Sequence, residues 1–245
     1  MTEYLLFTLY APLAAMGDIA VGERRDSWDR PGKSAVLGLV AAALGLERDD
    51  DLAHLALHDD HGYAVRIDCP GTPLTDYHTA QVPRSKSKVS HATRRDELSA
   101  PARGARLETI LSRRDYRVDA AYTAALWQRS DSKRALRDIA VALEKPHFSL
   151  YLGRKACPLG LPLDPTITTN PGLLEALAGR PVPKILRTIG LEFGASARLA
   201  FDTDATVPSG GVAVVRRDTV TTRSRWQFAP RTEHEMSIPL TNGGE

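Results

Sequence analysis

The order in which strand-like and helix-like apolar patterns alternate is the feature that most constrains the fold of this chain. Residues 4–10 (YLLFTLY) form a short, β-prone run that is typical of a buried strand. Residues 32–45 carry a helical pattern, and Gly45 lies where a C-cap glycine would end the helix. Residues 49–58 predict a second, short helix with acidic residues in its first turn.

Three strand patterns and one more helix follow. The predicted strands cover residues 62–68, 74–80 and 116–127. Residues 132–143 predict a helix whose apolar face holds Leu136, Ile139, Ala140 and Leu143, with Asp131 as N-cap and Pro146 beyond its end. The resulting order is compatible with a ferredoxin-like βαββαβ unit in an α+β fold, which is the topology of an RNA recognition motif.

One segment interrupts this pattern. Residues 83–112 are rich in basic residues, Ser, Pro and Gly, and predict an excursion from the core as a long loop or a hairpin. We therefore predict a core over residues 1–153 that includes the excursion. Residues 154–179 are dense in Pro and Gly and predict a linker, and residues 180–245 predict a smaller C-terminal portion with strands at 212–215 and 220–228.

The net charge of +2 hides an uneven distribution along the chain. Residues 83–117 carry ten Lys and Arg against four Asp and Glu, which gives +6, while the other residues carry 22 and 26, which gives −4. A basic segment on a mildly acidic body favours contact with a polyanion such as nucleic acid, although a solvated Ser- and Arg-rich loop would have the same composition.

Other bulk properties indicate a cytoplasmic protein. The longest apolar run, residues 35–46, is too short to span a bilayer, and the N-terminal sequence lacks the basic start of a signal peptide. The two cysteines do not form a disulfide framework. We expect no contact with a membrane and no cofactor.

The sequence Gly32-Lys33-Ser34 resembles the end of a phosphate-binding loop, but the glycine required five positions earlier is replaced by Ser27. A nucleotide-hydrolysing enzyme is therefore not expected. The start of a helix is still a general anion site, because its free N–H groups point outward. Lys33 and Ser34 are predicted to bind an RNA phosphate or a partner carboxylate there.

Histidines raise two further questions of chemistry. His54, His58 and His61 have a spacing that suits metal ligands on one helical face, but we expect ordinary exposed histidines and no metal site. Asp76, Tyr77 and His78 have three interpretations that the sequence leaves open. They suit acid–base chemistry on RNA, stacking and phosphate contact without catalysis, or a purely structural role.

Two more groups of cations are candidates for RNA contact. Arg154 and Lys155 follow Gly153, which would let the backbone approach a ligand closely. Near the C-terminus, arginines alternate with Trp226 and Phe228, and strand alternation would place Arg223, Arg225 and Gln227 on one face. A solvated sheet face explains the second pattern equally well.

Several stretches together resemble one known family. They are FTLYAPLAAMGD (7–18), RPGKSAVLGLVAAALGLERDD (30–50), YAVRID (63–68), LTDYHTA (74–80), RRDYRVDAAYTAALW (113–127) and KPHFSLYLGRKACPLGLPL (145–163). In this order they are similar to the RAMP-superfamily subunits of type I-E CRISPR surveillance complexes, called Cascade. The chain departs from the family pattern at Met16, usually Trp, and at Ala35, often Gly.

The resemblance implies an RRM-like RAMP core with a protruding thumb hairpin at 83–112. It further implies a subunit that holds the 5′ handle of the crRNA, packs against the CasC backbone subunit and the CasA large subunit, and meets target DNA through the complex. Such a subunit binds RNA without cutting it, because a separate subunit, CasE, cleaves the precursor RNA. The related type I-C subunits are themselves endoribonucleases, which keeps a catalytic alternative open.

We therefore expect a non-catalytic RNA-binding subunit in antiviral defence, with a metal-independent endoribonuclease as the alternative and a stand-alone RNA-binding module as a third hypothesis. The endoribonuclease would use His78, Tyr77 and a lysine such as Lys33 or Lys86. The predicted RNA-binding residues are Arg25, Lys33, Ser34, Tyr77, His78, Lys86, Lys88, Arg94, Arg113, Arg154, Lys155, Arg223 and Arg225.

Overall fold

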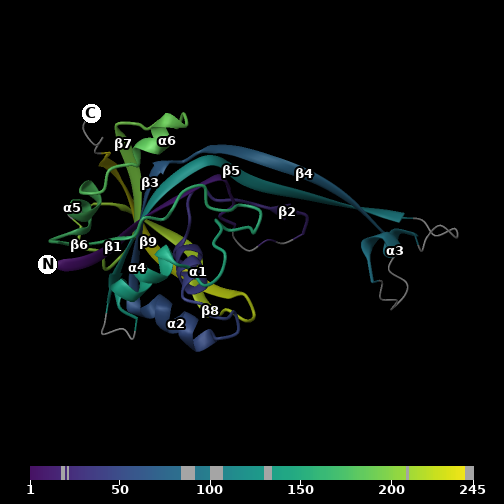
Figure 1. The fold of residues 1–245 in the computed structure, drawn as a ribbon, viewed down its shortest axis with the longest axis horizontal. Coiled ribbons are helices and arrows are strands. Elements are labelled where there is room, and N and C mark those ends of the chain that lie inside the picture. The colour runs from purple at the N-terminus through teal and green to yellow at the C-terminus, as the bar shows by residue number, and fades with distance from the viewer. Residues whose placement is uncertain are drawn as a thin grey trace.

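The computed structural model describes residues 1–17, 20, 22–83, 92–99, 107–129, 134–207 and 210–240, and all statements below concern these residues. They form a mixed α/β fold built on one large sheet (Figure 1). The strands are β1 (Thr2–Ala14), β2 (Arg24–Arg25), β3 (His61–Cys69), β4 (Thr72–Pro83), β5 (Leu107–Gln128), β6 (Thr166–Asn170), β7 (Ser196–Asp202), β8 (Val212–Thr222) and β9 (Gln227–Pro239). The helices are α1 (Lys33–Ala43), α2 (Asp51–Asp60), α3 (Arg94–Ser99), α4 (Leu136–Glu144), α5 (Leu173–Ala178) and α6 (Lys184–Thr188).

The main path of the sheet runs β6-β1-β5-β3-β7-β9-β8, and every neighbouring pair on it is antiparallel. The first half of β5 pairs instead with β4, which is not on this path. Leu107 lies opposite Pro83 at one end of the pairing, and Val118 lies opposite Thr72 at the other. These two strands form a long hairpin that projects far from the body of the molecule, with α3 beside its outer end (Figure 1). The short strand β2 runs parallel to β5 at the base of this hairpin.

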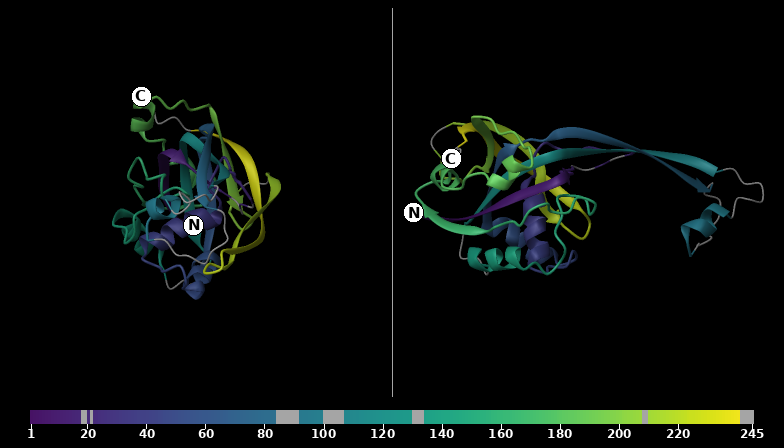
Figure 2. Two further views of the ribbon diagram at one scale, coloured as in Figure 1. Left: turned by 90° about the vertical axis from the view of Figure 1, so that its right-hand side faces the viewer. Right: turned by 45° about the horizontal axis from the view of Figure 1, so that its top comes forward.

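The alternation of side chains along β1 builds the core on both faces of the sheet. Leu5, Phe7 and Leu9 are buried on one face with α1 and α4, whereas Tyr4 and Leu6 are buried on the other with α5. Successive strand residues point to opposite faces, so a continuous apolar run indicates a strand that is covered on both sides. Figure 2 shows α4 and α1 on the side of the sheet away from α5 and α6.

The structure confirms most of the predicted elements, including the start of α1 at Lys33. Gly45 ends this helix with a φ of +76°, and the N–H groups of Gly45 and Leu46 donate to the carbonyls of Ala42 and Ala41. This is a Schellman motif with glycine at its left-handed position. Ala135 occupies the N-cap position of α4, whereas Asp131, the predicted N-cap, lies outside the described residues.

Two predictions for the second half of the chain are wrong. The segment 154–179 is not simply a linker, because it contains α5 and the strand β6, which pairs with β1. The predicted strand over 220–228 is divided by a turn, in which the N–H of Trp226 donates to the carbonyl of Arg223. The turn joins β8 to β9, and both strands continue the sheet that the N-terminal strands begin. None of the helices described here is long and apolar enough to cross a membrane.

Candidate nucleic-acid interface

The start of α1 is occupied by carboxylates from the C-terminal strands. The backbone N–H of Lys33 donates to Oδ2 of Asp218 at 2.8 Å, and its Nζ lies 3.0 Å from Oδ2 of Asp202. Lys33 is completely buried, and this burial lowers its pKa even though Asp202 acts in the opposite direction. The prediction that Lys33 contacts an RNA phosphate is therefore wrong, because this anion site is filled by the chain's own side chains.

Arg231 on β9 is the centre of the ion-pair network below α1. Its guanidinium lies 2.5 Å from Asp202, 2.9 Å from Asp218 and 2.7 Å from Glu233. Burial alone would lower the pKa of Arg231, but its bonds to Asp218 and the nearby carboxylates raise it. Arg30 also pairs with Glu233, so the network joins the segment before α1 to three C-terminal strands.

Above this network lies a groove of about 330 Å³, here called the arginine–aromatic groove. Its walls come from the segment before α1, from one side of α1, from residues 149–154 and from the β8–β9 turn. The charged and aromatic residues that line it are Arg25, Asp26, Trp28, Arg48, Tyr151, Arg154, Arg216, Arg217, Asp218, Arg223, Trp226 and Phe228. Six arginines face only two carboxylates, so the groove favours a polyanion.

Arginine and tryptophan pairs form two positions in the groove. The guanidinium of Arg216 lies 4.0 Å from the centre of the Trp28 ring, and that of Arg223 lies 4.2 Å from the Trp226 ring. Trp28 is 41% exposed and Trp226 is 52% exposed, so each ring retains surface for a second planar group. Such pairs bind bases by stacking and phosphates by charge.

The β8–β9 turn is held in place by α2. The N–H groups of Arg223 and Ser224 donate to Oδ1 of Asp51 at 2.6 and 2.9 Å, and the Ser224 hydroxyl donates to Oδ2 at 2.8 Å. The bonds from Ser224 and Arg223 lower the pKa of Asp51. Because residues 223–226 form this turn, Arg223 and Arg225 do not share the face of a strand, and only Arg223 lines the groove.

Small residues let the walls of the groove approach each other. Gly153 has a φ of +85°, and a Cβ atom there would lie 1.6 Å from the carbonyl oxygen of Ala15. Ser34 and Ala35, on the exposed side of α1, form part of the same wall, as does Gly38. Of the two departures from the family pattern, Ala35 therefore lines the groove, and Met16 is buried beside Trp28, with which it forms a β-bridge.

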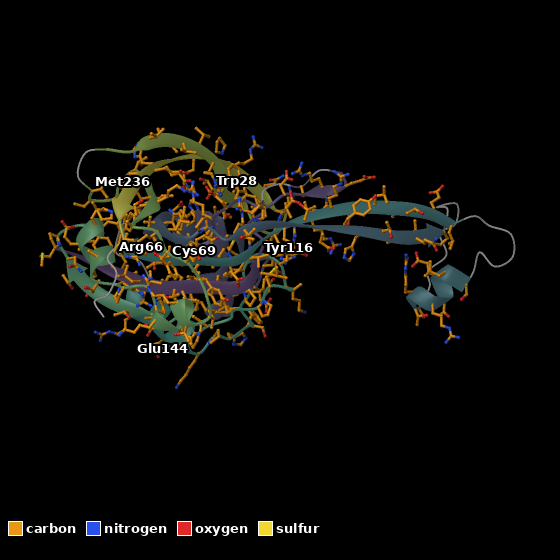
Figure 3. All side chains as sticks on the ribbon, turned by 90° about the horizontal axis from the view of Figure 1, so that it is seen from above. Trp28, Arg66, Cys69, Tyr116, Glu144 and Met236 are labelled. Atoms are coloured by element: carbon orange, nitrogen blue, oxygen red, sulfur yellow. The ribbon has the colours of Figure 1, made fainter. Side chains whose placement is uncertain are left out.

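Arg154 is bonded to the backbone beside the groove, whereas Arg25 is exposed in it. Arg154 donates from Nη1 to the carbonyl of Asp115 at 2.9 Å and from Nη2 to the carbonyl of Arg25 at 2.8 Å, and it lies 4.5 Å from the Tyr116 ring. It therefore joins the groove to the base of the hairpin, where Trp28 and Tyr116 both lie (Figure 3). Arg25 itself is exposed in the groove, and Lys155 is exposed on the neighbouring turn.

The hairpin carries Tyr77 and Arg113 on one face and His78 on the opposite face. Tyr77 lies opposite Arg113, 5.8 Å from its guanidinium, and His78 Nε2 lies 2.8 Å from Oδ2 of Asp76. Arg94 in α3 pairs with Glu97 at 2.5 Å and donates to the carbonyl of Gln81. Lys86 and Lys88 lie outside the described residues. Of the predicted set, Arg25, Ser34, Arg154 and Arg223 thus line the groove, and Tyr77, His78 and Arg113 lie on the hairpin.

This geometry bears on the endoribonuclease hypothesis. Successive residues of a strand point to opposite faces, so Tyr77 and His78 do not converge on one substrate atom. Lys33, one of the two lysines considered for this role, is buried against Asp202. Of the residues considered for catalysis, His78 keeps a carboxylate partner, Asp76.

The three clustered histidines are buried rather than exposed, which corrects the prediction. His54 Nε2 lies 3.0 Å from the carbonyl of Glu47, and both ring nitrogens of His61 face backbone carbonyls. His58 is 4% exposed, and burial lowers its pKa to about 4. Among the residues that the structure describes, no group of three His, Cys, Asp or Glu is arranged to hold a metal ion.

Sequence reasoning missed Trp28 and Arg48 as members of the site. Trp28 lies in the polar stretch GERRDSWDRP, and an aromatic residue among charged ones is the signal that points to an exposed ring. Arg48 gives no comparable signal, because only the tertiary fold brings it to Trp226. Arg216 belongs to the arginine-rich C-terminal group, but only the fold shows that it contacts Trp28.

Comparison with known proteins identifies the family to which the chain belongs. The family model of the CRISPR-associated protein (Cas_Cas5) matches residues 4–233, and the chain belongs to this family. It is 33% identical over 173 residues to the CRISPR system Cascade subunit CasD of Escherichia coli (strain K12), covering 66% of this chain and 70% of that protein.

Two solved structures are similar over almost the whole chain. One, described as a CRISPR RNA-guided surveillance complex, has a TM-score of 0.68 at 24% identity and covers 98% of this chain and 90% of its own. The other, described as a crystal structure of a Cas protein, has a TM-score of 0.60 at 28% identity and covers 98% of both chains. Both structures support the fold.

Proposed function

We propose that this chain is a non-catalytic, RNA-binding subunit of a type I-E CRISPR surveillance complex, and that the arginine–aromatic groove holds the 5′ handle of the crRNA. The observation that carries the proposal is the pair of exposed tryptophans, each with an arginine at its ring, inside a groove with a large excess of arginine. Membership of the family and similarity to the E. coli Cascade subunit CasD support the same conclusion.

Different residues of the groove would provide the affinity for RNA and the specificity for the handle. Arg25 and Arg217 would neutralise phosphates, so that affinity falls with salt at a logarithmic slope of about −0.7 per phosphate for single-stranded RNA. Trp28 and Trp226 would stack unpaired bases, whose edges and 2′-hydroxyls carry the information that distinguishes the handle.

The strand order supports an RRM-like RAMP core. β5 lies between β1 and β3 in the order β6-β1-β5-β3, with α1 and α4 on one face, as in a ferredoxin-like βαββαβ unit. The fourth strand is then β6, so the core extends to residue 170 and not only to 153. The projecting β4–β5 hairpin would be the thumb, and CasC and CasA would be the neighbouring subunits, with target DNA reached through the complex.

The test uses the complex assembled from purified subunits, a labelled CRISPR-repeat RNA and EDTA. The chain should retain intact RNA when the backbone subunit is present, and Trp28→Ala with Arg25→Ala should weaken retention strongly. Arg137→Ala, at an exposed arginine of α4 outside the groove, is the matched control.

Three results would contradict the proposal. Cleavage at one phosphodiester that His78→Ala abolishes would make the chain an endoribonuclease. Retention that depends on Tyr77 and Arg113 but not on the groove would move the interface to the hairpin. Tight RNA binding by the chain alone, unchanged by its partners, would support a stand-alone RNA-binding module.

A further inference from the structure

The two edge strands of the main sheet, β8 and β6, differ in how well they are protected against pairing with another strand. The edge strand β8 has two register shifts against β9 and carries Arg216, Arg217 and Asp218, and both features discourage pairing with another strand. The edge strand β6 (TITTN) has no charged residue and pairs with β1 in unbroken register. No described residue outside β1 forms a backbone–backbone hydrogen bond with residues 166–170. The outer edge of β6 therefore resembles an open template for pairing.

A groove runs along this open edge, here called the edge groove. It has a volume of about 980 Å³ and lies between β6 on one side and residues 179–187 on the other. Its apolar lining includes Leu6, Ile167 and Val182. Figure 2 shows β6 on the outer side of β1, toward the N-terminal end of the molecule. Five residues of an added strand would span about 17 Å at 3.3–3.4 Å per residue.

The charges along the edge groove are mainly positive. Arg180, Lys184 and Arg187 line it together with a single carboxylate, Asp164. Asp164 is already paired with Arg180, whose Nη2 lies 3.1 Å from Oδ2. Arg180 is buried in the wall and its Nε has no hydrogen-bond partner, whereas Lys184 is exposed on the rim. The rim therefore favours carboxylates.

We propose that the edge groove binds an extended, acidic segment of a neighbouring polypeptide, which pairs with β6 as an added strand. Its backbone would bond to the open edge, and its carboxylates would face Lys184. Because strand side chains alternate between faces, apolar side chains on one face would lie toward Ile167 and those on the other toward Leu6 and Val182. This proposal rests on the proposed function, because that function places the chain among protein subunits. A protein segment is favoured over RNA because, within the part of the chain that the structure describes, no aromatic residue lines the edge groove to stack a base.

Hydrogen–deuterium exchange measures the added strand directly. The free chain and the assembled complex are compared, with RNA bound in both samples or in neither. Exchange of the amides of residues 166–170 should slow at least about tenfold in the complex, because a paired edge opens only with the strand that covers it. Unchanged exchange at 166–170 in a complex that retains its RNA would overturn this inference and leave the proposed function standing.

Charge reversal tests the chemistry of the partner. Lys184→Glu should weaken assembly by roughly three- to tenfold at low salt, and the difference should shrink as salt screens it. Arg137→Glu, an exposed charge reversal outside the edge groove, is the control. Protection of 166–170 by RNA alone, or assembly indifferent to Lys184→Glu, would refute an acidic polypeptide as the occupant. A chain that never joins partner subunits would refute the proposed function itself.

Discussion

The guanidinium of Arg216 lies 4.0 Å from the centre of the Trp28 ring and joins β8 to the segment that precedes α1. Trp28 remains 41% exposed, so the arginine covers only part of the ring and fixes its orientation. A ring held in this way can receive a base without a large loss of side-chain entropy. The pair is therefore a prepared stacking surface rather than a mobile aromatic residue.

Trp28→Ala should weaken RNA retention by the assembled complex by about 5- to 150-fold, because stacking of one base contributes about 1–3 kcal/mol. Trp28→Phe should recover part of the loss, since it keeps a smaller ring. Fluorescence anisotropy with labelled repeat RNA measures the affinity. Phe148→Ala removes a partly exposed ring outside the groove and should leave affinity unchanged. Equal losses for the two alanine variants would argue against a stacking role for Trp28.

Arg231→Met should lower the free energy of unfolding by about 3–5 kcal/mol, because it leaves the buried carboxylates of Asp202, Asp218 and Glu233 without their shared partner. Denaturant titration measures this change. Arg217→Met, at an exposed arginine of β8, should change the same quantity by less than about 0.5 kcal/mol. A small effect of Arg231→Met would mean that the network contributes little to stability.

Stability should fall as the pH is lowered from about 6.5 toward 4. Burial holds the pKa of His58 at about 4, and the groups around it are Lys33, Asp59, Asp218 and Arg231. The unfolded chain takes up a proton near pH 6.5 while the folded chain does not, so acid favours unfolding by about 2–3 kcal/mol across this window. The pKa values of His54 and His61 are also lowered by burial, which acts in the same direction.

Chemical denaturation at several pH values tests this dependence. His58→Gln should flatten the fall between pH 6.5 and 4, because the substituted side chain does not titrate. His78→Gln, at an exposed histidine, is the matched control. A profile of the His58→Gln chain that coincides with that of the unaltered chain would exclude His58 as the source.

Arg154→Ala should loosen the base of the hairpin. The substitution removes two hydrogen bonds from a charged donor, to the carbonyls of Asp115 and Arg25, and each contributes about 1.5–3 kcal/mol. Amide exchange should rise in β2 and around Tyr116, and RNA retention should weaken because Arg25 loses its support. Lys155→Ala changes the neighbouring exposed cation and should do neither. Unchanged exchange in Arg154→Ala would rule out this bracing role.

Local patterns predicted local structure well. The start of α1, its end at Gly45 and the continuous apolar run of β1 depend on residues close together in the chain, and the structure confirms them. Lys33 was misjudged because its partners, Asp218 and Asp202, lie 185 and 169 positions away. Burial of the three histidines likewise depends on packing between distant elements, which no spacing rule contains.

The candidate interface was predicted only in part, again because it depends on contacts between residues far apart in the chain. Arg25, Ser34, Arg154 and Arg223 do line the groove. The alternation of Arg223, Arg225 and Gln227 predicts a strand, but residues 223–226 form a turn. A turn between two arginine-rich strands has the composition of either element, so periodicity alone did not separate them. The edge groove gave no signal at all, because its strand lies in a segment dense in Pro and Gly.

The ion-pair network around Arg231 has a consequence for the nascent chain. Trp28 is synthesised long before Arg216 and Trp226, which lie far downstream in the sequence. At about 5–20 residues per second, translation of the whole sequence takes roughly 10–50 s, and for most of that time Arg30 and Lys33 lack the carboxylates that hold them. The groove therefore exists only after synthesis of β8 and β9, so a nascent chain that lacks these strands cannot capture RNA in it.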